Sequence, residues 1–332
     1  MDDEDKIAFD EDRLLPGEPA PLPLEEALPE GHRSGFVALA GRPNVGKSTL
    51  LNRFVGEKVA IVSEKPQTTR NRLLGILTRP DAQVVFVDMP GLHQPRHLLG
   101  EYMMDQAASA LGDADLVLFM VDISTPPTPE DELAAQFLRE RTKAPAILVM
   151  NKGDLLDLRW RDERVEAYRR LGDFREGFII SALTGEGCPE LLERVVELLP
   201  EGPRYFPPDQ VSDQHDRFVV GELIREQVLH HTWHEVPHGV AVVVEQFKER
   251  PDGKVYLEAT IYVEKETHKG ILIGQGGQML KRIGQDARLA IEAYLEAPVY
   301  LDLWVKVRKN WRKREPELRR LGYRLPRKEK KG

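Results

Sequence analysis

Short apolar runs alternate with longer stretches of helical periodicity through the first two thirds of the chain. Apolar runs bounded by polar or turn-forming residues predict buried strands, and apolar residues spaced three and four apart predict helices between them. This alternation is typical of an α/β domain with a doubly wound, mostly parallel sheet. The predicted strands are Phe36–Ala40, Leu73–Thr78, Val84–Val87, Leu116–Val121, Ala146–Met150 and Phe178–Ile180, and the helices include Tyr102–Leu111, Glu130–Glu140 and Pro189–Leu199.

A proline-rich stretch separates this region from a second one with a different order of elements. Pro200–Pro208 has four prolines in nine residues, which argues against helix or central strand and indicates a linker. The sequence therefore predicts a first domain over residues 32–199, a linker over 200–212 and a small α+β domain over 213–309. The elements expected in the second domain are a helix near Arg217–His231, strands near Gly239–Gln246 and Val255–Val263, a helix over Gln278–Tyr294 and a strand over Val299–Val307.

The two ends of the chain carry opposite charge, which the net charge of −8 hides. Residues 1–31 contain eleven acidic and two basic residues, a local net charge of −9, together with five prolines. We expect this segment to be a disordered extension. Residues 302–332 contain thirteen basic and four acidic residues, a local net charge of +9. We expect residues 310–332 to form a basic tail that suits a polyanion.

The composition argues against several classes of protein. Hydrophobic residues make up 41% and charged residues 31% of the chain, as in globular proteins. No apolar run approaches the roughly 18 residues that a membrane span needs, and the acidic start lacks the features of a signal peptide. The single cysteine, Cys188, cannot form an internal disulfide and fits a reducing cytoplasm. A secreted, disulfide-stapled or membrane-spanning protein is therefore not expected.

The segment Gly41–Ser48 fits the pattern Gly-x-x-x-x-Gly-Lys-Ser between a predicted strand and a predicted helix. In that context the pattern predicts a phosphate-binding loop. The glycines let main-chain N–H groups surround a phosphate, and the helix N-terminus adds positive potential. Lys47 would reach the outer phosphates, and Ser48 would bind Mg²⁺.

Three further motifs follow predicted strands in the order that a GTPase requires. Asp88–Gly91 offers a carboxylate for the magnesium shell and an N–H at Gly91 that can sense the γ-phosphate. In Asn151–Asp154, the Asp154 carboxylate can accept two hydrogens from guanine, which adenine does not offer. Ser181–Leu183 can close over the base. Because ligands of doubly wound sheets bind at the C-terminal ends of the strands, these motifs predict a GTP site.

A polar segment between the phosphate loop and the Asp88 motif is the expected switch. Pro66–Asn71 contains two threonines, one of which would complete the magnesium shell when the γ-phosphate is present. Thr69 is our first choice and Thr68 the alternative. Leu92, the residue after Gly91, has no polar atom with which to orient the attacking water. Intrinsic hydrolysis should therefore be slow, or another group or ion must help.

A Gly-x-x-Gly loop at Gly274–Gly277 lies between an apolar run and an amphipathic helix. Such a loop alone is an ordinary turn between helices, but the surrounding order of elements and the adjacent Lys281 and Arg282 favour a KH domain. In KH domains the loop clamps about four nucleotides of RNA backbone. Trp304 and Trp311 lie among basic residues and could stack bases, although the alternating pattern around Trp304 favours a place in the core.

Together these segments resemble the Era family of bacterial GTPases over residues 36–323. The segments that carry the resemblance are Gly-Arg-Pro-Asn-Val-Gly-Lys-Ser-Thr-Leu-Leu-Asn, Gln-Thr-Thr-Arg, Asn-Lys-Gly-Asp, Glu-Ala-Pro-Val-Tyr-Leu-Asp-Leu-Trp-Val-Lys-Val and the closing Leu-Gly-Tyr. The resemblance implies a P-loop GTPase domain followed by a type II KH domain. It further implies a cytoplasmic factor of small-subunit assembly that binds GTP and GDP, the 3′ end of small-subunit ribosomal RNA and the pre-30S particle. Peripheral contact with the inner face of the cell membrane and the lack of a stable oligomer are also expected.

The resemblance also assigns roles to residues, together with a magnesium cofactor and a potassium activator. Lys47, Thr69 and Gly91 would act in hydrolysis, and Ser48, Thr69 and Asp88 would hold Mg²⁺. Asn44 would hold K⁺, as in related GTPases that lack the water-orienting glutamine. The expected RNA-binding residues are Gly274, Gln275, Gly276, Gly277, Lys281 and Arg282. The expected nucleotide-binding residues are Gly41, Arg42, Pro43, Asn44, Val45, Gly46, Lys47, Ser48, Thr49, Asp88, Met89, Pro90, Gly91, Leu92, Asn151, Lys152, Asp154, Ser181, Ala182 and Leu183.

The sequence departs from the family pattern in two places, and two alternatives stay open. Met89 replaces the usual threonine but leaves Asp88 and Gly91 intact, and the acidic residues 1–31 are unusual. One alternative is an RNA-binding module with a hydrolytically inactive nucleotide domain, which the intact nucleotide motifs disfavour. The other is a GTPase of transfer-RNA modification, which shares the nucleotide motifs but lacks the KH-like segment.

Overall fold

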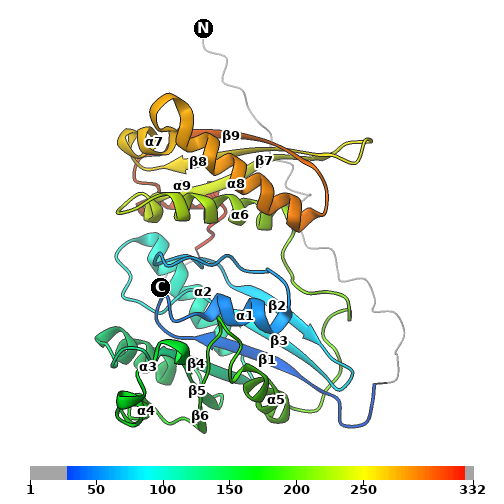
Figure 1. The fold of residues 1–332 in the computed structure, drawn as a ribbon, viewed down its shortest axis with the longest axis vertical. Coiled ribbons are helices and arrows are strands. Elements are labelled where there is room, and N and C mark those ends of the chain that lie inside the picture. Colours follow the sequence, from blue (N-terminus) through cyan, green and yellow to red (C-terminus); the bar gives the residue numbers. More distant parts are fainter. Residues whose placement is uncertain (1–27, 326–332) are drawn as a thin grey trace, which may run out of the picture.

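The computed structural model describes residues 28–325, so most of the acidic extension expected at residues 1–31 lies outside the described part. The first domain is built on a six-stranded sheet with the strand order β2-β3-β1-β4-β5-β6 (Figure 1). Every neighbouring pair is parallel except β2 and β3, which confirms the predicted mostly parallel sheet. The strands are β1 (Arg33–Ala40), β2 (Leu73–Thr78), β3 (Ala82–Asp88), β4 (Leu116–Asp122), β5 (Ala146–Asn151) and β6 (Glu176–Ile179).

Both faces of this sheet are buried, which explains why its central strands read as continuous apolar runs. Val37 and Leu39 of β1 point into one hydrophobic cluster and Ala38 and Ala40 into the other. Helices α1 and α5 cover the first face, and α2, α3 and α4 cover the second. The helices are α1 (Lys47–Val55), α2 (Leu98–Gly112), α3 (Pro129–Arg141), α4 (Arg161–Arg169) and α5 (Cys188–Leu198), and short 3₁₀ turns η2 (Gly153–Leu155) and η3 (Leu158–Trp160) follow β5.

The second domain packs its helices on one face of a three-stranded sheet with the order β7-β8-β9 (Figure 1). Strands β7 and β8 are antiparallel, whereas β8 and β9 are parallel, because two helices cross between them. The elements are α6 (Asp216–His231), η4 (Pro237–Gly239), β7 (Ala241–Glu249), β8 (Val255–Val263), α7 (Glu266–Ile273), η5 (Gln275–Gly277), α8 (Gln278–Leu295) and β9 (Val299–Val307).

The segment between the domains runs along the first domain as an ordered strap. The Ile76 N–H donates to the Val211 carbonyl at 2.9 Å, and the Gln83 side chain accepts the N–H groups of Tyr205 and Phe206. The first of these bonds uses a main-chain group of the outer strand β2, which would otherwise present an unpaired edge.

The residues after Asn310, expected as part of a basic tail, fold back between the two domains as far as the structure describes them. They form η6 (Trp311–Lys313) and α9 (Glu315–Arg320). Trp311 and Leu318 are fully buried in a cluster with Leu99 and Met103 of α2. Apolar residues spaced along an otherwise basic segment explain this packing: its cations stay at the surface while its apolar side chains are removed from water.

The two tryptophans of this region occupy opposite environments. Trp311 is fully buried, and its indole N–H donates to the Gly239 carbonyl at 2.9 Å. Trp304 is 53% exposed, so the expected core position of Trp304 is wrong. It shares with Tyr300 the face of β9 that the helices leave open, because alternate residues of a strand point to opposite faces.

In the part of the chain that the structure describes, no helix is long and apolar enough to cross a membrane.

Replacing the two tryptophans separately tests this packing. Trp311→Ala should lower the free energy of unfolding by about 3–5 kcal/mol, because it opens a cavity and leaves the Gly239 carbonyl without its donor. Trp304→Ala, the matched control, should cost about 1 kcal/mol or less because the ring is half exposed. Chemical denaturation of both variants measures the difference, and equal losses would contradict the buried position of Trp311.

Candidate functional site: a nucleotide cleft and an RNA-binding groove

The phosphate loop connects β1 to α1 and has a backbone that few residue types can adopt. Asn44 has a φ of 64° and Gly46 a φ of 99°, both in the left-handed region. A Cβ atom on Gly46 would also lie 2.2 Å from the Asn151 side-chain nitrogen. Glycine is therefore required at this position by both conformation and space, and the loop can bring its N–H groups to the N-terminus of α1.

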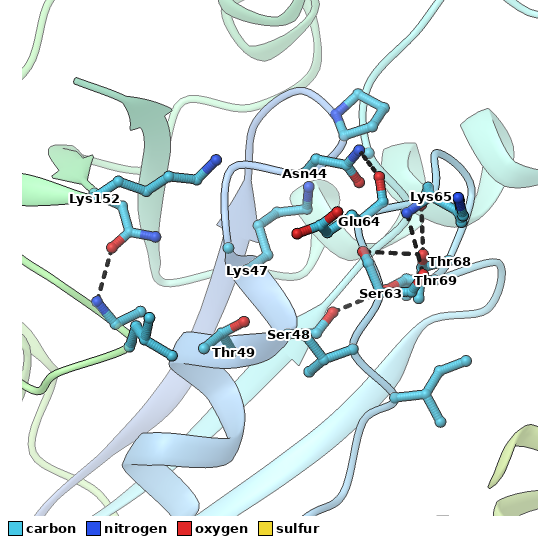
Figure 2. A pocket seen from close by; sticks show the side chains of 18 of the residues that line it. Asn44, Lys47, Ser48, Thr49, Ser63, Glu64, Lys65, Thr68, Thr69 and Lys152 are labelled. Atoms are coloured by element: carbon cyan, nitrogen blue, oxygen red, sulfur yellow. Dashed lines mark hydrogen bonds between the residues drawn. The ribbon is translucent and has the colours of Figure 1, made fainter. Parts of the chain in front are cut away.

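Lys47 begins α1 and turns its side chain back across the loop (Figure 2). Its ammonium donates to the carbonyls of Arg42 at 2.9 Å and Gly41 at 3.2 Å. Burial lowers the pKa of Lys47 to about 8, although the Asp88 carboxylate opposes this shift. An anionic phosphate in the loop would favour the charged ammonium in the same way.

Three oxygen atoms meet beside the loop, one from each residue expected to hold magnesium. The Ser48 hydroxyl lies 2.6 Å from an Asp88 carboxylate oxygen and 3.0 Å from the Thr69 hydroxyl, which is itself 3.2 Å from Asp88. Burial raises the pKa of Asp88, and the Lys47 ammonium opposes the shift. The second carboxylate oxygen of Asp88 is buried without a hydrogen-bond partner. An all-oxygen cluster at the cleft, built on a buried carboxylate with one unsatisfied oxygen, fits Mg²⁺, which prefers oxygen ligands.

The structure distinguishes the two candidate threonines by direction. The Thr68 hydroxyl donates within its own loop, to the Lys65 carbonyl at 2.6 Å. The Thr69 hydroxyl points to Ser48 and Asp88 instead. The Asn44 side-chain amide joins the phosphate loop to this segment, because it donates to the Glu64 carbonyl at 2.6 Å (Figure 2).

The residues after Asp88 reach the site through their backbone. A Cβ atom on Gly91 would lie 2.7 Å from the Pro43 backbone, so this close approach to the phosphate loop requires glycine. The Leu92 N–H donates to the Gly41 carbonyl at 3.0 Å, and its side chain is buried in the core of the domain, as is Met89. The Leu92 side chain is thus directed away from the nucleotide cleft.

The base-binding end is held together by Asn151. Its side chain donates to the Val45 carbonyl at 2.7 Å and accepts the Ala182 N–H at 2.8 Å. It therefore joins the phosphate loop to the segment Ser181–Leu183. Lys152 pairs with Asp122 at 2.7 Å, while Asp154 is exposed in the cleft with its carboxylate available to a ligand.

These parts enclose a cleft of about 840 Å³. Arg42, Val45 and Leu92 turn their side chains away from it, and Arg42 pairs with Asp131 at 3.0 Å. The second domain also contributes to the wall, which the sequence did not indicate. The expected residues that line the cleft are Pro43, Asn44, Gly46, Lys47, Ser48, Thr49, Thr69, Gly91, Asn151, Lys152, Asp154, Ser181, Ala182 and Leu183, and the second domain adds Leu229, His230 and Trp233.

A second cavity, of about 530 Å³, lies beside the Gly-x-x-Gly loop between α8 and the edge strand β9. Gly274, Gly276 and Gly277 all have positive φ, which the loop needs to turn from α7 into α8. Gly277 and Lys281 line the groove. Arg288, about two turns further along the same face of α8, also lines it and was not expected from the sequence. Arg282 lies on the same helix outside the groove wall.

A phosphate loop with an oxygen cluster, a guanine-selective motif at the neighbouring strand ends and an attached Gly-x-x-Gly groove define a P-loop GTPase joined to a KH domain. Residues 36–152 match the family described as 50S ribosome-binding GTPase, and residues 235–312 match the KH domain family. GTPase Era of Carboxydothermus hydrogenoformans is 48% identical over 296 residues, which cover 88% of this chain and 98% of that protein. The chain belongs to the Era family of GTPases, and it is a GTPase.

Two solved structures of the family are similar over nearly all of the described fold. One is Era in complex with MgGDPNP and nucleotides 1506–1542 of 16S ribosomal RNA, with a TM-score of 0.85 and 38% identity over 89% of this chain and 100% of that chain. The other is an Aquifex aeolicus Era variant bound to GDP·AlF₄⁻, with a TM-score of 0.84 and 38% identity over 88% and 100%. The predicted fold and family are confirmed. The match to the KH domain family disfavours the alternative of a GTPase of transfer-RNA modification, which would lack that domain.

The exposed carboxylate of Asp154 makes a direct test of base selection possible. Asp154→Asn should weaken GTP binding by about 1.5–3 kcal/mol per hydrogen bond lost to the charged group. Xanthosine triphosphate should bind the variant better than the parent, because it presents a carbonyl where guanine has its amino group. Calorimetry with both nucleotides measures this exchange. Equal affinity of the unmodified protein for GTP and ATP would contradict the guanine assignment.

Proposed function

We propose that this protein is a GTP-hydrolysing switch that binds the 3′ end of small-subunit ribosomal RNA through its KH domain during assembly of the small subunit. The groove between α8 and β9, next to the Gly-x-x-Gly loop, is the observation that supports this most directly. Its partners are GTP and GDP, the ribosomal RNA and the pre-30S particle. The proposal places the protein in the cytoplasm, with any membrane contact peripheral.

The chemistry of the groove suits a single strand of RNA. The loop presents main chain without side-chain bulk at Gly276 and Gly277, so phosphates can approach closely. Lys281 and Arg288 line the wall of the groove, where their cations can neutralise phosphates. Leu280 and Leu303 give the groove an apolar floor against which bases can lie.

In the nucleotide site, each residue has a distinct proposed task. Lys47 and the N-terminus of α1 hold the β- and γ-phosphates, and the Gly91 N–H donates to the γ-phosphate. Ser48, Thr69 and Asp88 would hold Mg²⁺, which when bound offsets the charge of the phosphates. Thr49 and Asp154 complete the binding of the nucleotide at its α-phosphate and base.

Asn44 is the proposed ligand of an activating K⁺. Its side chain reaches the main chain of Glu64, in the loop that leads to Thr69, so an amide oxygen and nearby carbonyl oxygens can converge at the phosphate loop. Since Leu92 is buried and apolar, it cannot orient water, and a monovalent cation would supply charge stabilisation between the phosphates instead.

Hydrolysis should therefore be faster in potassium than in sodium chloride. Asn44→Gly should remove this difference, because glycine adopts the φ of 64° without strain and only the side chain is lost. Steady-state phosphate release at equal ionic strength measures the rates. Equal rates of the unmodified protein in the two salts would exclude the potassium role.

The RNA role depends on the Gly-x-x-Gly loop. Replacing both Gln275 and Gly276 by Asp should abolish binding to the 3′-terminal ribosomal RNA, since two carboxylates would repel the phosphates. Both positions are exposed, and no atom lies within 4 Å of a Cβ at Gly276. Replacing both by Asn is the matched control, because the side chains have the same shape without the charge. Binding is measured by fluorescence anisotropy.

The salt dependence gives a second readout. Lys281→Gln should weaken RNA binding in part and lower the slope of log K against log salt by about 0.7, the value for one phosphate contact on a single strand. GTP affinity should be unchanged in the variants at Gln275, Gly276 and Lys281. An aspartate variant that folds, binds GTP and holds RNA as tightly as the unmodified protein would overturn the proposal.

A further inference from the structure

The second domain holds the switch loop of the first at many points. We define the switch segment as residues 58–70, which contain Thr69. Helix α6 contacts this segment at its beginning and in its middle: Glu226 accepts from the Lys58 ammonium at 2.6 Å and from the Val62 N–H at 2.9 Å. Glu226 is 2% exposed, so its carboxylate depends on these donors. The loop after α6 adds Trp233, whose ring lies 5.6 Å from the Lys65 ammonium.

Helix α6 also holds the end of the switch segment, next to the oxygen cluster of Ser48, Thr69 and Asp88. The Arg225 guanidinium, 1% exposed, donates to the Thr68 carbonyl and is oriented by a pair with Glu222 at 2.5 Å. The Thr68 carbonyl belongs to the peptide bond that leads into Thr69. Arg225 therefore fixes the plane of the peptide from which the Thr69 side chain departs.

Thr69 and Arg70 are consecutive residues with side chains in opposite domains. The Thr69 hydroxyl reaches Ser48 and Asp88 in the GTPase domain. The Arg70 guanidinium reaches the second domain, where it donates to the Val240 carbonyl at 2.6 Å and to the His238 carbonyl at 3.3 Å. Because neighbouring Cα atoms are about 3.8 Å apart, a fixed Arg70 limits where the Thr69 hydroxyl can lie.

The surroundings of Arg70 make this attachment specific for a guanidinium. Arg70 is 1% exposed, donates to the Tyr323 hydroxyl at 3.2 Å and lies 5.7 Å from the ring of Trp311. Burial lowers the pKa of Arg70 from its usual range. Its charge is surrounded by main-chain carbonyls, the Tyr323 hydroxyl and the Trp311 ring. Among residues 28–325, no carboxylate forms a salt bridge with it. A planar group with several donors matches this arrangement, and a lysine ammonium cannot reproduce it.

We propose that Arg70 and Arg225 are positioning residues for GTP hydrolysis, through which the KH domain and the segment 310–323 hold the Thr69 hydroxyl next to Ser48 and Asp88. Neither side chain lines the nucleotide cleft, so both act through Thr69. The inference rests on the proposed magnesium role of Thr69. It means that the second domain helps to form the GTP-bound state of the nucleotide site in addition to binding RNA.

The affinities for two nucleotides at varied magnesium concentration test the inference. Thr69 would act only when Mg²⁺ and the γ-phosphate are both present. Arg70→Ala should therefore weaken binding of a non-hydrolysable GTP analogue in Mg²⁺ at least tenfold and raise the Mg²⁺ concentration needed for half-saturation. GDP affinity should change less than twofold. In turnover, kcat should fall by more than KM rises.

Three further variants separate the possible causes. Arg225→Met should repeat the pattern from the other domain, and Arg70→Lys should recover part of the GTP-analogue affinity, since it keeps the cation but loses the fork of donors. Lys58→Ala is the matched control: it removes a contact of the same helix, yet Glu226 still holds the Val62 N–H and Thr69 is untouched, so the ratio of GTP-analogue to GDP affinity should stay the same.

The outcomes distinguish this inference from the magnesium assignment. If Thr69→Ala leaves the ratio of GTP-analogue to GDP affinity unchanged, the magnesium role of Thr69 is wrong. If Thr69→Ala lowers that ratio while folded Arg70→Ala and Arg225→Met do not, the positioning role is wrong. Equal weakening of GDP and GTP analogue in the arginine variants would indicate a structural role only, which also overturns the inference. Should Arg70→Ala fail to fold, Arg70→Lys and Arg225→Met decide the question by the same ratio.

Discussion

The buried carboxylate of Asp88 at the end of β3 is the constraint on which the nucleotide site depends. A charge in this position needs partners, and the site supplies the Ser48 and Thr69 hydroxyls and the nearby Lys47 ammonium. These groups come from the start of α1 and from the switch segment, and Ser48 and Thr69 are 21 residues apart in sequence. The need to satisfy one carboxylate therefore brings the start of α1 and the switch segment together at the end of β3.

The two domains are joined by the same requirement, because each has a buried charged side chain whose hydrogen-bond partners belong to the other domain. Arg70 leaves the GTPase domain to meet carbonyls of the second, and Glu226 of the second domain receives donors from the first. An apolar cluster formed by α2, β7, β8 and the segment after Asn310 lies beside Arg70, whose guanidinium is 5.7 Å from the Trp311 ring. Breaking the contact would leave buried polar groups on both sides without partners, so the domains are coupled by more than a linker.

Much of the fold and of the nucleotide site follows from local pattern. The six strands of the first sheet are predictable within a few residues, and the central ones most clearly, because strands buried on both faces are uninterrupted apolar runs. The phosphate loop was predictable because its backbone admits few residue types: Gly46 must have a positive φ, and Gly91 must leave room for Pro43. Family membership followed from the order of these motifs, since each motif sits at the end of its own strand.

The sequence by itself determined the residue types of the site, the type of each domain and the position of the Gly-x-x-Gly loop. Only the tertiary structure directed the Thr69 hydroxyl, and not that of Thr68, to Ser48 and Asp88. It also placed Trp304 at the surface and Trp311 in the core, and folded the residues after Asn310 between the domains. It alone showed where the Arg70 guanidinium goes. The reason is that a local pattern fixes which faces of an element are apolar or polar, whereas the partner that covers each face comes from a distant segment. Arg70 and Val240 are far apart in sequence, and the residues around either one do not indicate that the two are in contact.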